Sequence, residues 1–305
     1  MNGFSVARKA AAYLPTLAVY LAVAAMIFMA EEVREAFVEG LKLSVCTVLP
    51  SVFPFVVISD FMSSRVRCSK APFAARMKGA LKMNGVALSI FSLGLVCGFP
   101  VSGRSASVAY STGGIDKREC ERLCAVASNP SVAFVISTVG ALIGSPRVGV
   151  VLYPCVVLSA IAVAVLNRPR EIKIDKTDHI AGQNFDFTAS IKTAGASCIT
   201  VSSFVITFSL LLSLLKSAIK SPLLIGLLSS VLEIGNAAAT LCSLPFCFHK
   251  KICLIAFSLG FSGVCALMQI YSFLPPEISR PRIFLLKLEQ GFFAALLALF
   301  ASYFI

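Results

Sequence analysis

The stretch Phe91-Ser-Leu-Gly-Leu-Val-Cys-Gly-Phe-Pro-Val-Ser-Gly-Arg-Ser-Ala-Ser107 begins as an apolar, membrane-type run and then changes to small polar residues around Arg104. Proline removes a backbone donor and clashes with the preceding turn, and glycine adds backbone freedom, so Gly98-Phe-Pro100 predicts a helix break. Because lipid cannot hydrogen-bond the freed backbone groups, such a break must be packed inside protein or line a watery cavity. Transporters use broken helices in this way, although an ordinary loop between two spans is the alternative.

A second stretch repeats this pattern later in the chain. Phe257-Ser-Leu-Gly260 is identical to Phe91-Ser-Leu-Gly94, and Phe261-Ser-Gly-Val-Cys-Ala266 follows it, again small and glycine-rich. Paired interruptions in the two halves of an apolar chain point to a transporter-like site near the midplane of the bilayer. We therefore expect breaks at 98–105 and 260–266.

The composition of the chain is that of a protein of the lipid bilayer. Of its 305 residues, 57% are hydrophobic and 14% are charged. A soluble single domain would leave more apolar surface than one core can hide. The net charge of +12 would suggest nucleic acid in a soluble protein, but here the basic residues lie at the ends of apolar runs, as in cytoplasmic loops. We predict an all-α polytopic membrane protein that does not bind nucleic acid.

Apolar and polar segments divide the chain into four parts. These are an N-terminal transmembrane helix at 1–30, a first half at 31–166, a polar linker at 167–187 and a second half at 188–305. Basic residues before the first apolar run place the N-terminus in the cytoplasm. The apolar runs amount to about eight or nine membrane segments, some of them re-entrant, when each span needs roughly 20 residues.

The two halves show further signs of a repeat. Thr47-Val48 and Phe55 match Thr200-Val201 and Phe208 at one fixed offset. A cytoplasmic linker would make the second half enter the membrane opposite to the first, as inverted repeats do. We therefore expect two related, inverted halves with broken or re-entrant helices.

Two charged segments need a separate interpretation. The segment 31–40 is either an amphipathic turn at the outer interface or an extension of the next helix. The segment 116–127 begins with an Asp-x-x-Glu helix start and has Leu123 and Cys124 opposite its charged side chains. Its charge predicts a surface helix.

Glu233 is the most informative charge, because it lies inside the apolar run 223–241. By insertion scales, an unpaired charge at the middle of a membrane helix costs about 2.5–3.5 kcal/mol. Glu233 can bind a coupling cation or a proton, or it can accept a hydrogen bond from a substrate hydroxyl. The alternative is a salt bridge with Lys220 or Lys251.

Other polar side chains near the breaks have one functional and one structural interpretation. Gln269 can recognise a polar substrate or form an interhelical hydrogen bond. Asn129 can face the cavity or cap the next helix. Arg104 can meet an anion at a helix N-terminus, but we favour a side chain that extends to the interface. The full set of candidate substrate-binding residues is Gly98, Ser102, Arg104, Asn129, Glu233, Asn236, Ser262 and Gln269.

Enzymatic and metal sites are not expected. Gly260-Phe-Ser-Gly263 has the nucleophile pattern of rhomboid intramembrane proteases, but a serine nucleophile needs a base, and no histidine follows it. Cys242, Cys247 and His249 form a Cys/His cluster that lacks the four ligands of a structural zinc site. We therefore expect no enzymatic activity, no metal and no cofactor.

Several motifs together resemble the sporulation integral membrane protein family of the YlbJ type, which carries the nucleoside-recognition or Gate domain. The motifs are Gly40-Leu-Lys-Leu43, Pro50 with Pro54-Phe55, Gly98-Phe-Pro-Val-Ser-Gly103, Ser128-Asn-Pro130, Leu232-Glu-Ile-Gly-Asn236, and the segment from Phe261-Ser-Gly263 to Gln269. The resemblance spans most of the chain. It implies a bacterial inner-membrane protein that acts in sporulation and spore envelope maturation, with kinship to Gate-domain transport proteins.

Together these observations lead to two hypotheses about function. The first is transport or permeation of a small polar solute, nucleoside-like by family analogy. The second is a scaffold that positions spore-envelope enzymes without transporting anything. In both cases the lipid bilayer is a partner, and a homo-oligomer or an assembly with other sporulation membrane proteins stays open.

Overall fold

The computed structural model describes residues 26–65, 72–169 and 186–304, together with positions 17, 19, 20, 23 and 24. Every regular element among them is a helix, which confirms the predicted helical class. Most of the predicted N-terminal transmembrane helix (1–30) and most of the polar linker (167–187) fall outside the described residues. The first-half elements are α2 (Ala30–Leu43), η1 (Ser44–Val48, a π-helical turn), α3 (Leu49–Arg65), α4 (Pro72–Leu81), α5 (Gly85–Cys97), α6 (Phe99–Ser111), α7 (Lys117–Val126), η2 (Phe134–Val139, also π-helical), α8 (Gly140–Ile143) and α9 (Pro146–Leu166). The second-half elements are α10 (Phe187–Ala218), α11 (Pro222–Leu232), α12 (Ile234–Ser243), α13 (Phe248–Phe261), α14 (Gly263–Ser272) and α15 (Arg280–Ala301).

Four helical segments are long and apolar enough to cross a membrane: Pro146–Leu166, Phe187–Ala218, Phe248–Ser272 and Arg280–Ala301. Large apolar side chains remain exposed on them, for example Ile199, which is 71% exposed. A soluble monomer rarely carries so much exposed apolar surface, whereas a lipid-facing surface requires it. The chain is therefore a helical protein of the membrane type.

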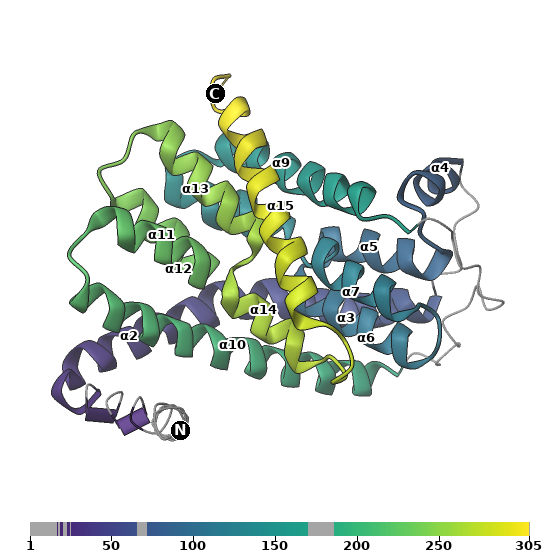
Figure 1. The fold of residues 1–305 in the computed structure, drawn as a ribbon. Coiled ribbons are helices and arrows are strands. Elements are labelled where there is room, and N and C mark those ends of the chain that lie inside the picture. Colours follow the sequence, from purple (N-terminus) through teal and green to yellow (C-terminus); the bar gives the residue numbers. More distant parts are fainter. Residues whose placement is uncertain are drawn as a thin grey trace, which may run out of the picture.

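Two long helices run side by side along one edge of the molecule. α2, η1 and α3 follow one another without interruption, and α10 packs along them (Figure 1). The charged segment 31–40 is part of α2, so it extends the next helix and does not form a separate interfacial turn. α10 also contacts α11 and α14, so this helix of the second half packs against elements of both halves.

Four helix breaks interrupt the described apolar segments. They lie at Gly98 between α5 and α6, at 128–131 between α7 and η2, at Glu233 between α11 and α12, and at Ser262 between α13 and α14. α5 packs against α6, and α11 packs against α12, so each of these pairs is a helical hairpin. In Figure 1 the α5–α6 hairpin lies at the right and the α11–α12 hairpin at the left.

Apart from α4, which only the first half has, a similar order of elements occurs in each half. A long helix is followed by a hairpin, a second broken helix and a final long helix, which is α9 in the first half and α15 in the second. α9 and α15 pack on each other, and both contribute to the two largest clusters of buried apolar side chains. The contact between these two helices therefore joins the first half to the second.

The prediction of a surface helix at 116–127 is wrong, because α7 is buried despite its charges. Arg122 is buried and donates to the carbonyl oxygens of Leu81 (2.8 Å) and Ala164 (3.1 Å). It also forms a salt bridge with Glu119, at 2.8 Å. Buried Glu121 accepts a hydrogen bond from the backbone N–H of Ser279 at 3.0 Å. Glu119 balances the charge of Arg122, and backbone groups distant in sequence complete the hydrogen bonds of Arg122 and Glu121, so burial is possible.

Candidate functional site

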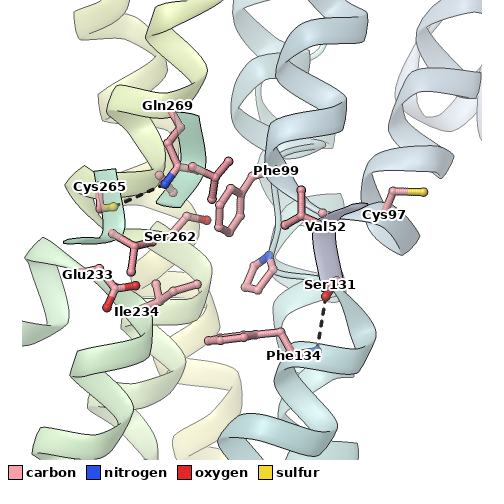
Figure 2. Close-up of a pocket in the computed structure, with 15 residues that line it drawn as sticks. Val52, Cys97, Phe99, Ser131, Phe134, Glu233, Ile234, Ser262, Cys265 and Gln269 are labelled. Atoms are coloured by element: carbon pink, nitrogen blue, oxygen red, sulfur yellow. Dashed lines mark hydrogen bonds between the residues drawn. The ribbon is translucent and has the colours of Figure 1, made fainter. Parts of the chain in front are cut away.

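A cavity lies at the point where the four helix breaks meet (Figure 2). Its wall includes Gly98 from the first break, Pro130 from the second, Glu233 from the third and Ser262 from the fourth. The space between the lining residues, including its opening to the outside, is about 550 Å³. Breaks in membrane helices must be buried in protein or line a cavity, and this arrangement meets that requirement.

The two halves contribute different chemistry to this cavity. Figure 2 shows Glu233, Ser262 and Gln269 on one side, all from the second half. On the other side are Phe99 and Phe134, from the first half. The second half therefore supplies most of the polar groups of the cavity, and the first half supplies its two aromatic rings. A ligand with a flat apolar face and a polar edge would match both sides.

Glu233 forms the N-terminal cap of α12 and is not at the middle of a helix. Its two carboxylate oxygens accept hydrogen bonds from the backbone N–H groups of Gly235 (2.9 Å) and Asn236 (2.7 Å). The side chain is buried, with 4% of its surface exposed, and it lies at the positive end of the α12 dipole, which stabilises a negative charge. A carboxylate has further lone pairs, so Glu233 can still accept a hydrogen bond from a ligand.

The alternative interpretation of Glu233, a salt bridge with Lys220 or Lys251, is not what the structure shows. Among the residues that the structure describes, no salt bridge joins Glu233 to a cation. The Lys251 amine instead donates to the carbonyl oxygen of Cys242 at 2.7 Å. The backbone N–H groups of α12, and no lysine, thus hold the carboxylate in place.

Gln269 has an unused hydrogen-bond acceptor at the cavity. Its Nε2 donates to Cys265 Sγ at 3.4 Å, while Oε1 has no partner among the described residues. The side chain is buried. A buried oxygen without a partner costs about 1–3 kcal/mol, so a ligand or water that donates to it would be favoured. Gln269 therefore fits the predicted position of a substrate-recognising amide.

Ser262 marks a break that is held tightly in place. Its φ of +71° is in the left-handed region, which serine rarely adopts, and its hydroxyl donates to the carbonyl oxygen of Ser128 at 3.2 Å. The next residue, Gly263, also has a positive φ, and a Cβ there would lie 3.0 Å from the carbonyl oxygen of Leu232. The fourth break thus contacts both the second and the third. Strained backbone of this kind persists where the surrounding structure fixes it, often at functional sites.

Two candidate residues lie away from the cavity lining because other side chains bind them. Arg104 forms a 3.4 Å salt bridge with Asp60 on α3 and is only about one third exposed. It is neither at an anion site in the cavity nor free to extend into the interface. Asn236 donates from Nδ2 to Ser209 Oγ on α10 at 2.8 Å. Both were candidates for the substrate site, and both instead connect neighbouring helices.

The other two candidates outside the cavity lining lie in or next to the second break. Ser102 lies within α6, because the first break is the single residue Gly98 and not the whole stretch 98–105. Its hydroxyl is 2.9 Å from that of Ser128. Asn129 donates to the carbonyl oxygen of Val126 at 2.7 Å and accepts from Gln290, so its amide points away from the cavity lining.

A buried lysine near the breaks was missed by the sequence analysis. Lys287 on α15 donates from Nζ to the carbonyl oxygen of Ser128 at 2.8 Å and to Gln290 Oε1 at 3.0 Å. The available signal was a lysine and a glutamine three residues apart inside the last apolar run. On a helix, such residues face the same side.

No family model, no curated protein and no solved structure matches the chain. The assignment of Gly98, Glu233, Ser262 and Gln269 to a substrate therefore remains a prediction from sequence and geometry.

Proposed function

We propose that the chain is a multi-pass membrane protein that moves a small polar solute through the cavity at the four helix breaks. The observation that carries this proposal is the convergence of all four breaks on one cavity that contains the buried Glu233. Broken helices that meet near the bilayer midplane are the arrangement by which many secondary transporters bind a solute. The bacterial inner membrane and a role in sporulation come from the family resemblance alone.

The element order supports a proposal of two inverted halves. Each half contains a hairpin and a second broken helix, and the two hairpins lie at different ends of the molecule (Figure 1). Inverted repeats bring two such hairpins to the centre from opposite membrane faces. Alternating exposure of the cavity would then follow from rocking one half against the other.

The chemistry of the cavity favours a solute with an aromatic or otherwise flat apolar part and hydrogen-bond donors. Phe99 and Phe134 offer ring surfaces, whereas Glu233 and Gln269 offer acceptor oxygens. A nucleoside has a planar base and several hydroxyl donors, so it is the solute class that we propose to test first.

Uptake by proteoliposomes tests the proposal. Vesicles with the purified chain should accumulate radiolabelled nucleosides above the level of empty vesicles, and Glu233→Gln should abolish the difference. Lys251→Gln serves as a matched control, because Lys251 lies outside the cavity lining. Equal uptake by protein-containing and empty vesicles for every nucleoside would contradict the nucleoside proposal.

The scaffold hypothesis makes the opposite prediction in cells. It expects that Glu233→Gln and Gln269→Ala leave sporulation intact. Changes in the segment 63–83, which has six basic and no acidic residues, should instead abolish it. Transport expects the reverse. Counting heat-resistant spores from strains with these variants separates the two hypotheses.

A further inference from the structure

A polar contact joins three helices that also line the cavity. Asp60 on α3 forms a 3.4 Å salt bridge with Arg104 on α6, and it accepts a hydrogen bond from Ser190 Oγ on α10 at 3.2 Å. The contributions of the same helices to the cavity lining include Val52, Phe99 and Val201. At about 1.5 Å per residue, the polar contact therefore lies roughly 8–17 Å from the cavity along these helices.

Buried apolar side chains occupy the level between the cavity and the salt bridge. They form one cluster from α3, α5, α6 and α10, whose members are Val56, Leu93, Cys97, Val101 and Ala194. Cys97 also lines the cavity, so the cluster begins at the cavity wall. On α3, Val52, Val56 and Asp60 follow one another at intervals of four residues, and such residues lie on one face of a helix. Cavity, apolar cluster and salt bridge are therefore three successive levels of one stack.

The outer end of this stack lies beside polar sequence. α10 begins at the end of the polar linker (167–187), and its first turn is exposed at Asp186 and Thr188. Ser111, the last residue of α6, is exposed as well. The side chains of the salt bridge are themselves 28% and 34% exposed. The stack thus separates the cavity from the side of the molecule on which the linker lies.

We propose that the apolar cluster and the Asp60–Arg104 salt bridge form a gate that closes the cavity on the linker side. Apolar constrictions close membrane pathways because they exclude water. The gate is shut in this structure, since Val56, Val101 and Ala194 are each at most 4% exposed. It opens when α6 separates from α3 and α10, which breaks the salt bridge. This inference rests on the proposed transport function and adds to it the place at which the cavity is closed.

Val101→Cys provides a reporter inside the gate. Val101 is buried, so a thiol at this position should react slowly with N-ethylmaleimide while the gate is shut. Asp60→Asn or Arg104→Gln, each added to the reporter, removes the salt bridge. A partly exposed ion pair contributes modestly, so each variant should raise the labelling rate at position 101 about two- to fivefold. Mass spectrometry of the labelled peptides measures this rate for the purified chain in detergent.

Three controls accompany the labelling. Arg34→Gln also removes a salt bridge, the one with Glu31 on α2, and it should leave the rate at position 101 unchanged. Cys124 is fully buried in α7 and should stay unlabelled in every variant, which shows that the chain remains folded. The exchanged pair Asp60→Arg with Arg104→Asp should return the rate to that of the reporter alone.

Two results would overturn the gate. One is a labelling rate in both single variants that equals the rate of the reporter alone, and the other is a raised rate that persists in the exchanged pair. If Val101→Cys does not fold, the native Cys97 of the same cluster serves as the reporter. Labelling needs no solute, so a failure of uptake contradicts the transport proposal, whereas the labelling rates decide the gate.

Discussion

Gly94→Ala tests the close packing that supports the cavity. Gly94 is buried in α5, and a Cβ at this position would lie 2.2 Å from the carbonyl oxygen of Ala127 and 2.9 Å from Ser102 Cβ. Ordinary contacts of a Cβ are at 3.4–4 Å, so the first of these contacts is not tolerated without movement. Ala127 directly precedes the second helix break, and a shift here would move the cavity wall.

The expected cost follows from this geometry. The Ala127 carbonyl must withdraw by roughly 1 Å, and overpacking of this kind costs about 1–3 kcal/mol. We expect the upper end, about 3 kcal/mol, because the atom that must move belongs to the backbone and not to a flexible side chain. For a protein of this size that corresponds to a fall of about 6–12 °C in the unfolding temperature.

The assay is thermal unfolding of the purified chain in detergent, with Gly195→Ala as the control. Gly195 lies in α10, and a Cβ there would meet nothing within 4 Å. Alanine is favoured over glycine inside a helix by about 0.5–1 kcal/mol, so the control should be as stable as the wild type or slightly more stable. The packing argument is refuted if Gly94→Ala unfolds at the temperature of Gly195→Ala.

Three further substitutions give separate expectations. Arg122→Met should lower the free energy of unfolding by about 3–5 kcal/mol, because it leaves Glu119 and buried carbonyls without their partner. The control Arg34→Met, on the exposed face of α2, should leave the unfolding temperature unchanged. Thermal unfolding of both variants in parallel makes the comparison. Gln269→Leu should preserve or raise stability, because it removes an oxygen that has no partner, yet it should weaken solute uptake; unchanged uptake would remove Gln269 from the site. Glu233→Ala should lose the cap of α12, at a cost of about 0.5–2 kcal/mol in denaturant or thermal unfolding, and a stability equal to that of the wild type would contradict the capping role.

Local chemistry made the first and the fourth helix breaks predictable from the sequence. At the first break, Gly98 has a φ of +93°, which glycine adopts without strain, and Pro100 follows at the start of α6. The fourth break was predicted from the glycine-rich stretch after Gly260, and the structure places it at Ser262. In both cases the residues that interrupt the helix are adjacent in the chain.

The third break was not predicted, because its cause is a capping interaction inside an apolar run. Leu-Glu-Ile-Gly-Asn reads as continuous helix by composition, and Glu233 was expected at mid-span. The signal was the placement of Glu233 directly before Gly235 and Asn236, whose N–H groups it binds. The repeated Phe-Ser-Leu-Gly lies in α5 and in α13, which take different places in the order of elements.

Long-range contacts explain the remaining differences. The charges of α7 predicted a surface helix. However, Arg122 binds the carbonyl oxygens of Leu81, 41 positions before it, and Ala164, 42 positions after it. Lys287 likewise meets Ser128 only in the folded chain. Pairings of this kind leave no periodic pattern in the sequence, so only the structure reveals them.

Cysteine labelling tests most directly whether the helix breaks share one cavity that water and solute can enter. Ser131→Cys places a thiol in the cavity wall, and Ser203→Cys places one on an exposed position of α10, where we expect lipid. In proteoliposomes treated with a water-soluble thiol reagent, mass spectrometry of the peptides should find label at position 131, less label when nucleoside is present, and none at position 203. Equal labelling at both positions, or labelling of position 131 that no nucleoside slows, would contradict a solute-binding cavity at the breaks.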